Sequence, residues 1–347
     1  MKVSRWMLVA GAAALVVAVA LAGSIGVAKA PAAAATAFKS ALVLDTGGPN
    51  DNGFNKNQVV GLKKASAQIH GTYLELLSNS SSDYSPNYTQ AVNAGSNIII
   101  AAGFLLESTV QQYAQANPGT KFAITDDPAS AVGGYKNEMG ITYKTQQGGC
   151  LVGVLAAKEA QNLGHKVIGV VGGFEIPPVD SYIAGYKYCA QKAVPGTTVV
   201  VKYSDNFNDP TQCSPLAKQE IDQNNAEVIF QVAGGCGDGA LSYATSHGKW
   251  GIGVDSDESS TFSNNLLTSA LKKTDVGVEQ VILKAFNHKW NGGHNVALSL
   301  SNNGVGVGKI DASVPKAWIS LMNNYKAQIL NGSLKPPAHC PNNSCGS

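Results

Sequence analysis

The chain has 347 residues, of which 44% are hydrophobic and only 14% are charged. A chain of this length can bury a large core, and about two domains are expected. The formal net charge of +2 argues against a nucleic-acid partner, which would need a dense basic surface.

The first residues are predicted to be an export signal. "MKVSR" is basic, the following "WMLVAGAAALVVAVALAG" is apolar, and small residues occupy 28–37. We expect cleavage after Ala35 or Ala37, because Pro31 would follow a cut after Ala30. The apolar stretch is close to the ~20 residues that span a bilayer, so an uncleaved membrane anchor is the alternative. Either way the protein is expected outside the cytoplasm, in the periplasm or at the cell surface.

From residue 40 onward, short apolar runs alternate with amphipathic stretches. Two such cycles occur, at about 40–140 and 165–257, and no low-complexity linker divides them. Near-continuous Val/Ile runs joined by helices indicate parallel sheets covered on both faces. We expect strands at 40–45, 72–78, 97–103, 121–126, 139–143, 167–173, 197–203, 227–234, 251–255 and 265–271. We expect helices at 55–69, 85–95, 105–118, 146–164, 179–195, 209–224, 237–248 and 314–337.

Polar, glycine-rich turns follow most of the predicted strands. They occur at 45–54, 101–104, 125–128, 171–178, 203–210, 233–239 and 254–259. Turns need Gly, Asp, Asn and Pro in any case, but their repetition at the carboxyl ends of strands in two cycles is informative. Ligands of open α/β sheets bind at that edge. The sequence therefore predicts a cleft between two facing lobes.

Catalytic motifs are missing from these turns. The sequence contains no GxSxG elbow, Walker loop or HExxH, and the six histidines are scattered. "DTGGPNDNG" has some similarity to the calcium-binding turn of nucleoside hydrolases. However, Gly47 and Asn52 stand where that turn carries acids, and calcium prefers several carboxylates. We expect no enzyme, metal or cofactor, with a calcium-dependent nucleoside hydrolase as the remote alternative.

Six cysteines in an exported chain permit disulfides, in 15 possible pairings. Cys340 and Cys345 could close a short tail loop. Cys213 and Cys236 follow successive strands of one lobe, so both are expected at its rim and could pair. Cys150 and Cys189 are predicted on helices. For any of these cysteines the alternative is a small buried hydrophobic side chain.

Two aromatic residues interrupt the polar turns. Phe54 ends "DTGGPNDNGF" and Phe207 lies in "YSDNFNDP", so each belongs to a different cycle. Either ring could cap the core of its own lobe. If both face the cleft, they suit a flat ligand stacked between them, whose edges Asp and Asn side chains would bind through hydrogen bonds.

Several blocks, in order, resemble the basic membrane protein family, the PnrA/Med-like nucleoside-binding components of ABC importers. They are Asp45, Phe54-Asn55, "GLKKA" at 61–65, "AGFLLESTVQQYAQANPGTKFAITD", "VIGVVGG", "AGYKYCAQKAVPG", "FNDP", "VIFQVAGGCGDGAL", "IGVDSDES", "LLTSALKKTDVGV" and "SNNGVGVGKI". The resemblance spans about 40–335. Cys150 and Cys236 depart from the Ala-like and Thr-like residues of the family, and the lipid-anchoring cysteine is missing.

The resemblance implies a type I periplasmic-binding-protein fold, in which two doubly wound parallel-sheet lobes close on a hinge around a central cleft. Phe54 and Phe207 would sandwich the base of a nucleoside, which is expected to be a purine. Asp45, Asn55 and Asp126 would bond its edge. Asp255 and Lys272 would hold the ribose, while Gly234 and Gly235 allow close backbone approach. Asp127 is expected to face solvent.

We therefore expect a monomeric extracytoplasmic protein that binds a nucleoside and delivers it to an ABC permease. The predicted parts are a signal or anchor at 1–37, lobe 1 at 38–145, lobe 2 at 146–258, hinge-crossing segments that complete both lobes at 259–335, and a cysteine-containing tail at 336–347. A ligand-sensing protein of the same fold, or a binder of a sugar or other small polar metabolite, remains the alternative.

Overall fold

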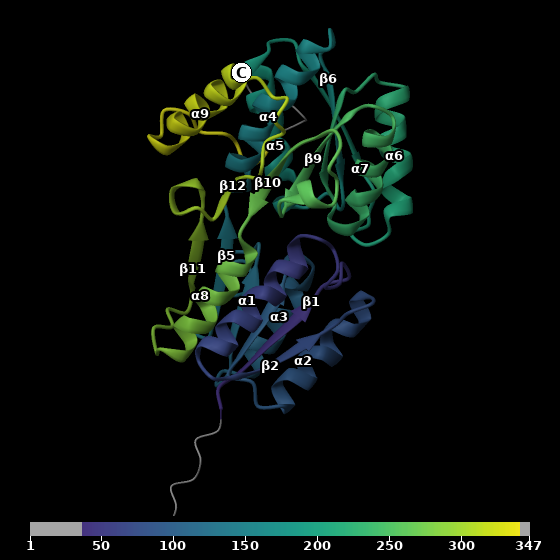
Figure 1. Ribbon diagram of the computed structural model, residues 1–347. Coiled ribbons are helices and arrows are strands. Elements are labelled where there is room, and N and C mark those ends of the chain that lie inside the picture. Colours follow the sequence, from purple (N-terminus) through teal and green to yellow (C-terminus); the bar gives the residue numbers. More distant parts are fainter. Residues whose placement is uncertain (1–36, 341–347) are drawn as a thin grey trace, which may run out of the picture. The chain divides into compact units, whose positions relative to one another are not determined.

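The computed structural model describes residues 37–340, which belong to one compact unit, Ala37–Ser347. The predicted signal or anchor, apart from Ala37, lies outside the described residues. The fold contains two six-stranded sheets, each covered by helices (Figure 1). We call the sheet with strand order β11-β5-β4-β3-β1-β2 and its helices lobe 1, and the sheet with order β12-β10-β9-β8-β6-β7 and its helices lobe 2. The predicted fold class is confirmed.

Lobe 1 is built from an all-parallel sheet. Its strands are β1 (Lys39–Leu44), β2 (Thr72–Leu76), β3 (Ile98–Ala102), β4 (Lys121–Thr125), β5 (Glu138–Tyr143) and β11 (His294–Leu298). Its helices are α1 (Phe54–Gln68), η1 (Ser81–Asp83), α2 (Tyr84–Asn93), η2 (Phe104–Leu106), α3 (Glu107–Ala116) and α8 (Thr274–Phe286).

Lobe 2 is parallel except for β12, which runs antiparallel to β10. Its strands are β6 (Val167–Gly172), β7 (Thr198–Tyr203), β8 (Val228–Val232), β9 (Trp250–Asp255), β10 (Leu266–Lys272) and β12 (Val305–Val307). Its helices are α4 (Thr145–Asn162), α5 (Pro177–Ala193), α6 (Pro210–Asp222), η3 (Gly234–Cys236), α7 (Gly237–Ser246), η4 (Glu258–Ser260) and α9 (Lys316–Leu330). η5 (Leu300–Asn302) joins β11 to β12.

Alternate residues of each central strand belong to two separate hydrophobic cores, because successive side chains of a strand point to opposite faces of the sheet. Leu42 and Leu44 of β1 pack under α1 and α8, while Ala41 and Val43 pack under α2 and α3. In lobe 2 the corresponding cores lie under α4 and α5 on one face and under α6 and α7 on the other. Strands buried on both faces explain the near-continuous apolar runs in the sequence.

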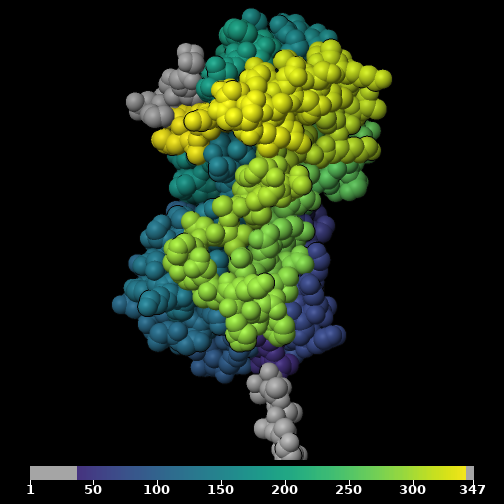
Figure 2. Space-filling view, turned by 90° about the vertical axis from the view of Figure 1, so that its left-hand side faces the viewer, coloured from purple at the N-terminus to yellow at the C-terminus, as the bar shows by residue number. Residues whose placement is uncertain are grey.

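The chain crosses between the lobes from β5 to α4, from β10 to α8 and from β11 to β12. α8 and β11 therefore join lobe 1 although they follow lobe 2 in sequence, and Figures 1 and 2 show these late segments in yellow-green among the purple and blue elements. Backbone bonds tie the crossings together, since Lys144 N–H donates to the Leu298 carbonyl at 2.9 Å and Lys273 N–H to the Gly304 carbonyl at 2.9 Å.

The ten predicted strands coincide with β1–β10, but the sequence analysis missed α8, β11 and β12. β12 has three residues, and β11 is mostly exposed, so neither shows the apolar run of a buried strand. The sequence of α8 follows β10 directly and gave no separate signal. The domain boundaries 38–145, 146–258 and 259–335 stay predictions.

Two disulfides lie in lobe 2. Cys150 of α4 is bonded to Cys189 of α5, and Cys213 of α6 to Cys236 of η3. The second pair is one that the sequence analysis named as possible, whereas the first was not predicted. The α4–α5 contact is close, because a Cβ atom on Gly149 would lie 2.2 Å from the Tyr182 carbonyl oxygen. Cys345 lies outside the described residues, so the pairing of Cys340 with Cys345 stays a prediction.

Candidate functional site

A pocket lies where the carboxyl ends of strands from both sheets face each other. It contains about 560 Å³ of empty space, its open mouth included. Turns and helix starts of both lobes line it: Asp45, Gly47, Asp51, Phe54, Asn55, Gly103, Phe104, Leu105, Asp126, Ile176, Pro178, Val179, Tyr182, Phe207, Val232, Gly234, Val254, Asp255 and Lys272.

The turn after β1 is organised by the buried carboxylate of Asp51. It accepts hydrogen bonds from the backbone N–H groups of Gly53 at 3.1 Å, Asn55 at 2.7 Å and Lys56 at 3.1 Å. These are N–H groups that the first turn of α1 cannot satisfy within the helix. Burial raises the pKa of Asp51 to about 6, although the three hydrogen bonds act in the opposite direction. The carboxylate thus fixes Phe54 and its neighbour at the pocket wall.

Asp45, which follows β1 directly, is held in place by Asn55. The Asn55 amide donates to Asp45 Oδ1 at 2.6 Å, and the backbone N–H of Gly47 donates to the same oxygen at 2.9 Å. Burial raises the pKa of Asp45 to about 6. The amide oxygen of Asn55 is buried and has no hydrogen-bond partner within the described structure. The pair therefore presents unused acceptor capacity to the pocket.

The one lysine in the pocket lining, Lys272 at the end of β10, forms an ion pair with Asp126, which follows β4. Their side chains are 3% and 6% exposed, so this ion pair between the lobes is shielded from water. The ion pair of Lys272 is thus with Asp126 and not with Asp255, while the expected role of Lys272 and Asp255 toward a ribose stays a prediction. Asp255 instead accepts a hydrogen bond from the hydroxyl of Tyr182 at 3.0 Å. Burial raises the pKa of Asp255 to about 6, and the charge of Lys272 opposes that rise.

The rings of Phe54 and Phe207 belong to different lobes and line the same pocket. The ammonium of Lys272 lies 4.6 Å from the centroid of the Phe54 ring. Phe207 meets the edge of Phe174, with ring centroids 5.1 Å apart at 64°. Behind it, Gly234 adopts φ +55°, and a Cβ atom there would lie 3.2 Å from the Phe207 carbonyl oxygen. A side chain at Gly234 would thus be strained and crowded.

Most of the predicted site residues line this pocket: Asp45, Phe54, Asn55, Asp126, Phe207, Gly234, Asp255 and Lys272. Gly235 does not, since it lies behind the wall, where a Cβ atom would be 3.5 Å from the Phe207 carbonyl oxygen and 3.6 Å from the Cα of Asp51. The roles of these residues toward a ligand stay predictions.

The expected exposure of Asp127 is wrong. This residue is 3% exposed and its Oδ2 atom has no hydrogen-bond partner among the described atoms. Burial, followed by the neighbouring carboxylates of Glu107 and Asp126, raises its pKa to about 7. The loop after β4 folds back under β5 and β11, and the Asn295 side chain accepts the N–H of Ala129 at 2.8 Å. No pattern in the sequence indicated that this loop would fold back and become buried.

Sequence reasoning missed two polar contributors, Asp51 and Tyr182. Asp51 could have been found, because an Asp just before a helix start is a common acceptor for the free N–H groups of the first turn. Tyr182 lies inside α5, away from the strand-end turns on which the prediction relied. The apolar wall made by Phe104, Leu105, Ile176, Pro178 and Val179 was missed as well, because apolar side chains give no hydrogen-bonding signal.

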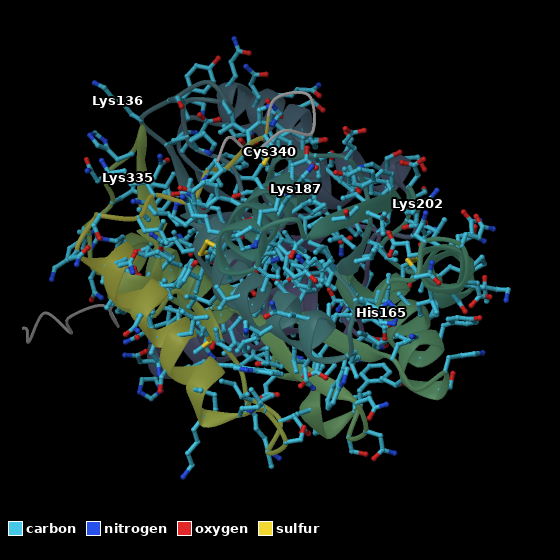
Figure 3. All side chains as sticks on the ribbon, turned by 90° about the horizontal axis from the view of Figure 1, so that it is seen from above. Lys136, His165, Lys187, Lys202, Lys335 and Cys340 are labelled. Carbon is cyan, nitrogen blue, oxygen red and sulfur yellow. A yellow bond between two sulfur atoms is a disulfide. The ribbon has the colours of Figure 1, made fainter. Side chains whose placement is uncertain are left out.

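Histidines do not line the pocket. His165, labelled in Figure 3, precedes β6 and lies at the opposite end of that strand from the pocket, where its Nε2 atom is 3.6 Å from Glu227 Oε1. Within residues 37–340, the His, Cys, Asp and Glu side chains form no cluster that could hold a metal ion. Every helix in that range is too short or too polar to cross a membrane.

Residues 38–338 match the family model described as ABC transporter substrate-binding protein, PnrA-like (Bmp). The ABC transporter nucleoside-binding protein BmpA of Lactococcus lactis is 29% identical over 330 residues, which cover 87% of this chain and 90% of the relative. A protein of Pyrococcus abyssi named as an uncharacterized lipoprotein is 28% identical over 303 residues, covering 84% of this chain and 74% of the relative.

The fold is similar to that of an ABC transporter solute-binding protein from Aeropyrum pernix. The TM-score is 0.78 at 23% identity, and the match covers 86% of this chain and 94% of that structure. Together with the two parallel-sheet lobes, this similarity establishes a type I periplasmic-binding-protein fold. Since the family model matches nearly all of the described residues, the chain belongs to the Bmp family of PnrA-like ABC transporter substrate-binding proteins, which bind solutes and are not enzymes.

Proposed function

We propose that this protein binds a nucleoside with a purine base between its lobes and, as an extracytoplasmic monomer, presents it to an ABC permease. The observation that carries the proposal is the pair of phenyl rings, Phe54 and Phe207, which reach one pocket from two lobes. Aromatic faces stack on a flat base in offset geometry, which adds about 0.5–1.5 kcal/mol per pair beyond the burial of area.

The polar groups of the pocket are mostly acceptors. Asp45, Asn55 and Asp126 would accept hydrogen bonds from the base, and Asp255 would accept them from the vicinal hydroxyls of the ribose. Lys272 lies beside both Asp126 and the Phe54 ring, so its charge compensates carboxylates that the ligand would further desolvate. A ligand rich in N–H and O–H donors fits this arrangement.

The charge of the pocket also argues against phosphorylated ligands. The carboxylates of Asp45, Asp51, Asp126 and Asp255 line it together with the single ammonium of Lys272. A phosphate group would add negative charge to this surplus in a partly dry site. We infer that the free nucleoside, and not the nucleotide, is the ligand. The name of the Lactococcus relative as a nucleoside-binding protein supports the same class.

Delivery requires a closed form that the permease can recognise. The two lobes touch around the pocket mouth, where the side chain of Asn52 donates to Asp238 Oδ2 at 2.8 Å and that of Asn57 to Ser256 Oγ at 2.9 Å. A nucleoside that contacts both lobes would favour this closed arrangement over an open one, and its differential affinity for the two forms sets the shift.

Isothermal titration calorimetry on Ala37–Ser347 tests the proposal with guanosine, inosine, adenosine, uridine, guanosine 5′-monophosphate, ribose and common hexoses. We expect binding of purine nucleosides, weaker or no binding of the nucleotide and sugars, and a loss of about tenfold or more in F54A and F207A. F286A is the matched control, because Phe286 is 39% exposed and packs on Phe38 instead of the pocket. Binding of a sugar alone would overturn the nucleoside assignment while leaving the family intact.

A further inference from the structure

The two disulfides of lobe 2 occupy different environments. Cys150–Cys189 joins α4 to α5 within the larger core of the lobe. Cys213–Cys236 joins the first turn of α6 to η3 in the smaller core, next to the loop that carries Phe207. All four cysteines are fully buried. The difference lies in what each bond holds.

Cys236 contacts the loop of Phe207 directly. Its backbone N–H donates to the Phe207 carbonyl at 3.2 Å, and its Sγ atom lies 3.5 Å from the hydroxyl oxygen of Ser204, where that loop begins. The loop ends at Asp209, the residue that caps α6, and Cys213 lies one helical turn further on. The disulfide therefore joins α6, just beyond the end of the Phe207 loop, to Cys236, whose N–H binds the Phe207 carbonyl in the middle of that loop.

The remaining supports of this loop are local. The Asn206 side chain accepts the N–H groups of Asn208 and Asp209, both at 2.7 Å, and Asp205 adopts φ +51°. Ser204 and Asp205 are anchored to the end of β6 through the carbonyls of Gly172 and Gly173. These contacts fix the start of the loop. From Phe207 onward, the Cys236 N–H and the disulfide connect the loop and the start of α6 to η3, while the Phe207 ring packs on Phe174.

The same bond holds the part of lobe 2 that faces lobe 1. Gly234 lines the pocket, Gly235 approaches the Cα of Asp51, and Asp238 accepts the cross-lobe hydrogen bond from Asn52. Cys236 lies in the middle of this short segment. A shift of Cys236 would therefore move the stacking ring and the closing surface together.

We propose that the Cys213–Cys236 disulfide is a positioning element for ligand binding, which fixes Phe207 and the segment 234–238 in their binding geometry. Cys150–Cys189, by contrast, lies about two helical turns along α5 from Tyr182, so we expect it to stabilise the lobe with little effect on the geometry of the pocket. The inference rests on the proposed nucleoside function for its affinity readout, but the positioning itself is measurable without any ligand.

The test compares C213A/C236A with the control C150A/C189A, both in Ala37–Ser347, by calorimetry with the purine nucleoside that the wild type binds best. We expect affinity to fall about tenfold in C213A/C236A, comparable to the loss of one well-placed aromatic contact, and to stay within about twofold in C150A/C189A. Hydrogen exchange of the unliganded proteins should become faster at 204–209 and 234–238 in the first variant and should leave both segments protected in the second.

Equal affinity in the wild type and C213A/C236A, or equal losses in both double variants, would overturn the inference. If the wild type binds no nucleoside, the proposed function fails, and the exchange rates at 204–209 and 234–238 alone decide the positioning role. Should C213A/C236A not fold, C150A/C189A is compared before and after treatment with dithiothreitol. The reagent is oxidised to its cyclic disulfide while the Cys213–Cys236 bond becomes two thiols, as does the bond of Cys340, and the same losses are expected.

Discussion

The two lobes each present one phenyl ring to the pocket but hold it by different means. In lobe 1, Phe54 is the first residue of α1, Asp51 binds the N–H groups of that turn, and the hydroxyl of Thr274 donates to the Phe54 carbonyl at 3.0 Å. In lobe 2, Phe207 lies in the loop between β7 and α6 and is bound through Cys236. A ring at the start of a helix is positioned by the cap of that helix, whereas a ring on a loop needs a contact with a neighbouring element.

The distribution of the cysteines matches this difference between the lobes. The segments that build lobe 1, residues 38–144 and 274–298, contain no cysteine, while lobe 2 contains both disulfides found within residues 37–340. Burial of an amphipathic helix and a polar cap are enough to order the lobe 1 site. In lobe 2 a covalent bond replaces the regular structure that the Phe207 loop lacks.

The lobes are more alike in how they present a carboxylate. Asp126 directly follows β4 of lobe 1 with φ +72°, and Asp255 ends β9 of lobe 2 with φ +61°. Non-glycine residues in this conformation cost on the order of 1–3 kcal/mol and concentrate at functional sites. Each carboxylate has one strong partner, Lys272 for Asp126 and the Tyr182 hydroxyl for Asp255. The same backbone device thus aims an acid into the pocket from both sides.

The largest expected effect concerns stability. Removing Cys150–Cys189 or Cys213–Cys236, whose sequence separations are 39 and 23, should each lower the free energy of unfolding by about 3–4 kcal/mol in the chain-entropy account. Because this term depends on the logarithm of loop length, the two variants should differ by less than about 1 kcal/mol. Urea unfolding of C150A/C189A and C213A/C236A measures both values. A near-zero loss for either would show that its bond constrains the unfolded chain little.

The pH dependence of stability is expected to differ between the surroundings of Asp255 and those of Asp126. Next to Asp255, Glu258 is 2% exposed and accepts hydrogen bonds from the Gln231 amide and the Val254 N–H. Next to Asp126, an uncharged hydrogen bond joins Thr125 to Gln58 at 2.7 Å. Burial raises the pKa of Glu258 from 4.5 to about 8. The stability that comes with the protonated acid is therefore full below pH 4.5 and is lost as the pH rises through 8.

Between pH 6.5 and 8.5 the wild type should lose about 2 kcal/mol of unfolding free energy through Glu258 alone. E258Q keeps an oxygen acceptor and cannot ionise, so its loss over the same interval should be smaller by that amount. Urea titrations at the two pH values measure the difference between the variants, in which other titrating groups cancel. Parallel pH profiles would mean that Glu258 is ionised throughout.

Sequence reasoning was most successful where the physics is local. Runs such as "SALVL" and "VIGVV" are buried on both faces, so their apolar pattern is sufficient to identify strands. β11 has only one covered face at the edge of its sheet, and the pattern there is too weak. The positions of Phe54 and Phe207 in polar turns similarly predicted their place at strand ends, since that edge is shared by all parallel strands.

Pairings between distant residues could not be predicted in this way. Lys272 lies 146 positions from Asp126 in the sequence. It pairs with Asp126 and not with Asp255 because of the position that the crossing from β10 to α8 gives its ammonium group. The bond between Cys150 and Cys189 requires α4 and α5 to pack side by side, and glycines such as Gly149 make that approach possible. Such choices depend on assembled geometry that no short segment encodes.

The N-terminal caps of α1 and α6 provide a sharper test of the comparison between the two lobes. D51A removes the acceptor of three backbone N–H groups at α1 and should lower the free energy of unfolding by about 1–2 kcal/mol, with weaker nucleoside binding as Phe54 loses its fixed position. D209A removes the corresponding cap of α6, but Cys213–Cys236 still holds that helix, so nucleoside affinity should change little. Calorimetry on both variants decides. Equal losses of affinity would mean that the disulfide does not substitute for the cap.

The smallest expected effect lies where the lobes meet. Asn52 of lobe 1 donates to Asp238 of lobe 2 at 2.8 Å, and burial raises the pKa of Asp238 while this bond opposes the rise. A single hydrogen bond contributes about 0.5–1.5 kcal/mol net, so D238A should weaken nucleoside binding about two- to tenfold. The change should appear in the dissociation rate, because the bond forms only once the lobes have closed.

A double-mutant cycle separates this bond from other effects of the substitutions. If Asn52 and Asp238 act together, the loss of affinity in N52A/D238A should be smaller than the sum of the two single losses, since the second change removes a bond that is already broken. The left-handed backbone of Asn52, at φ +58°, adds a cost to N52A, but that cost appears equally with and without Asp238 and cancels in the cycle. Strictly additive losses would show that the two side chains do not interact in the bound state, and closure would then rest on the ligand and on the contact between Asn57 and Ser256.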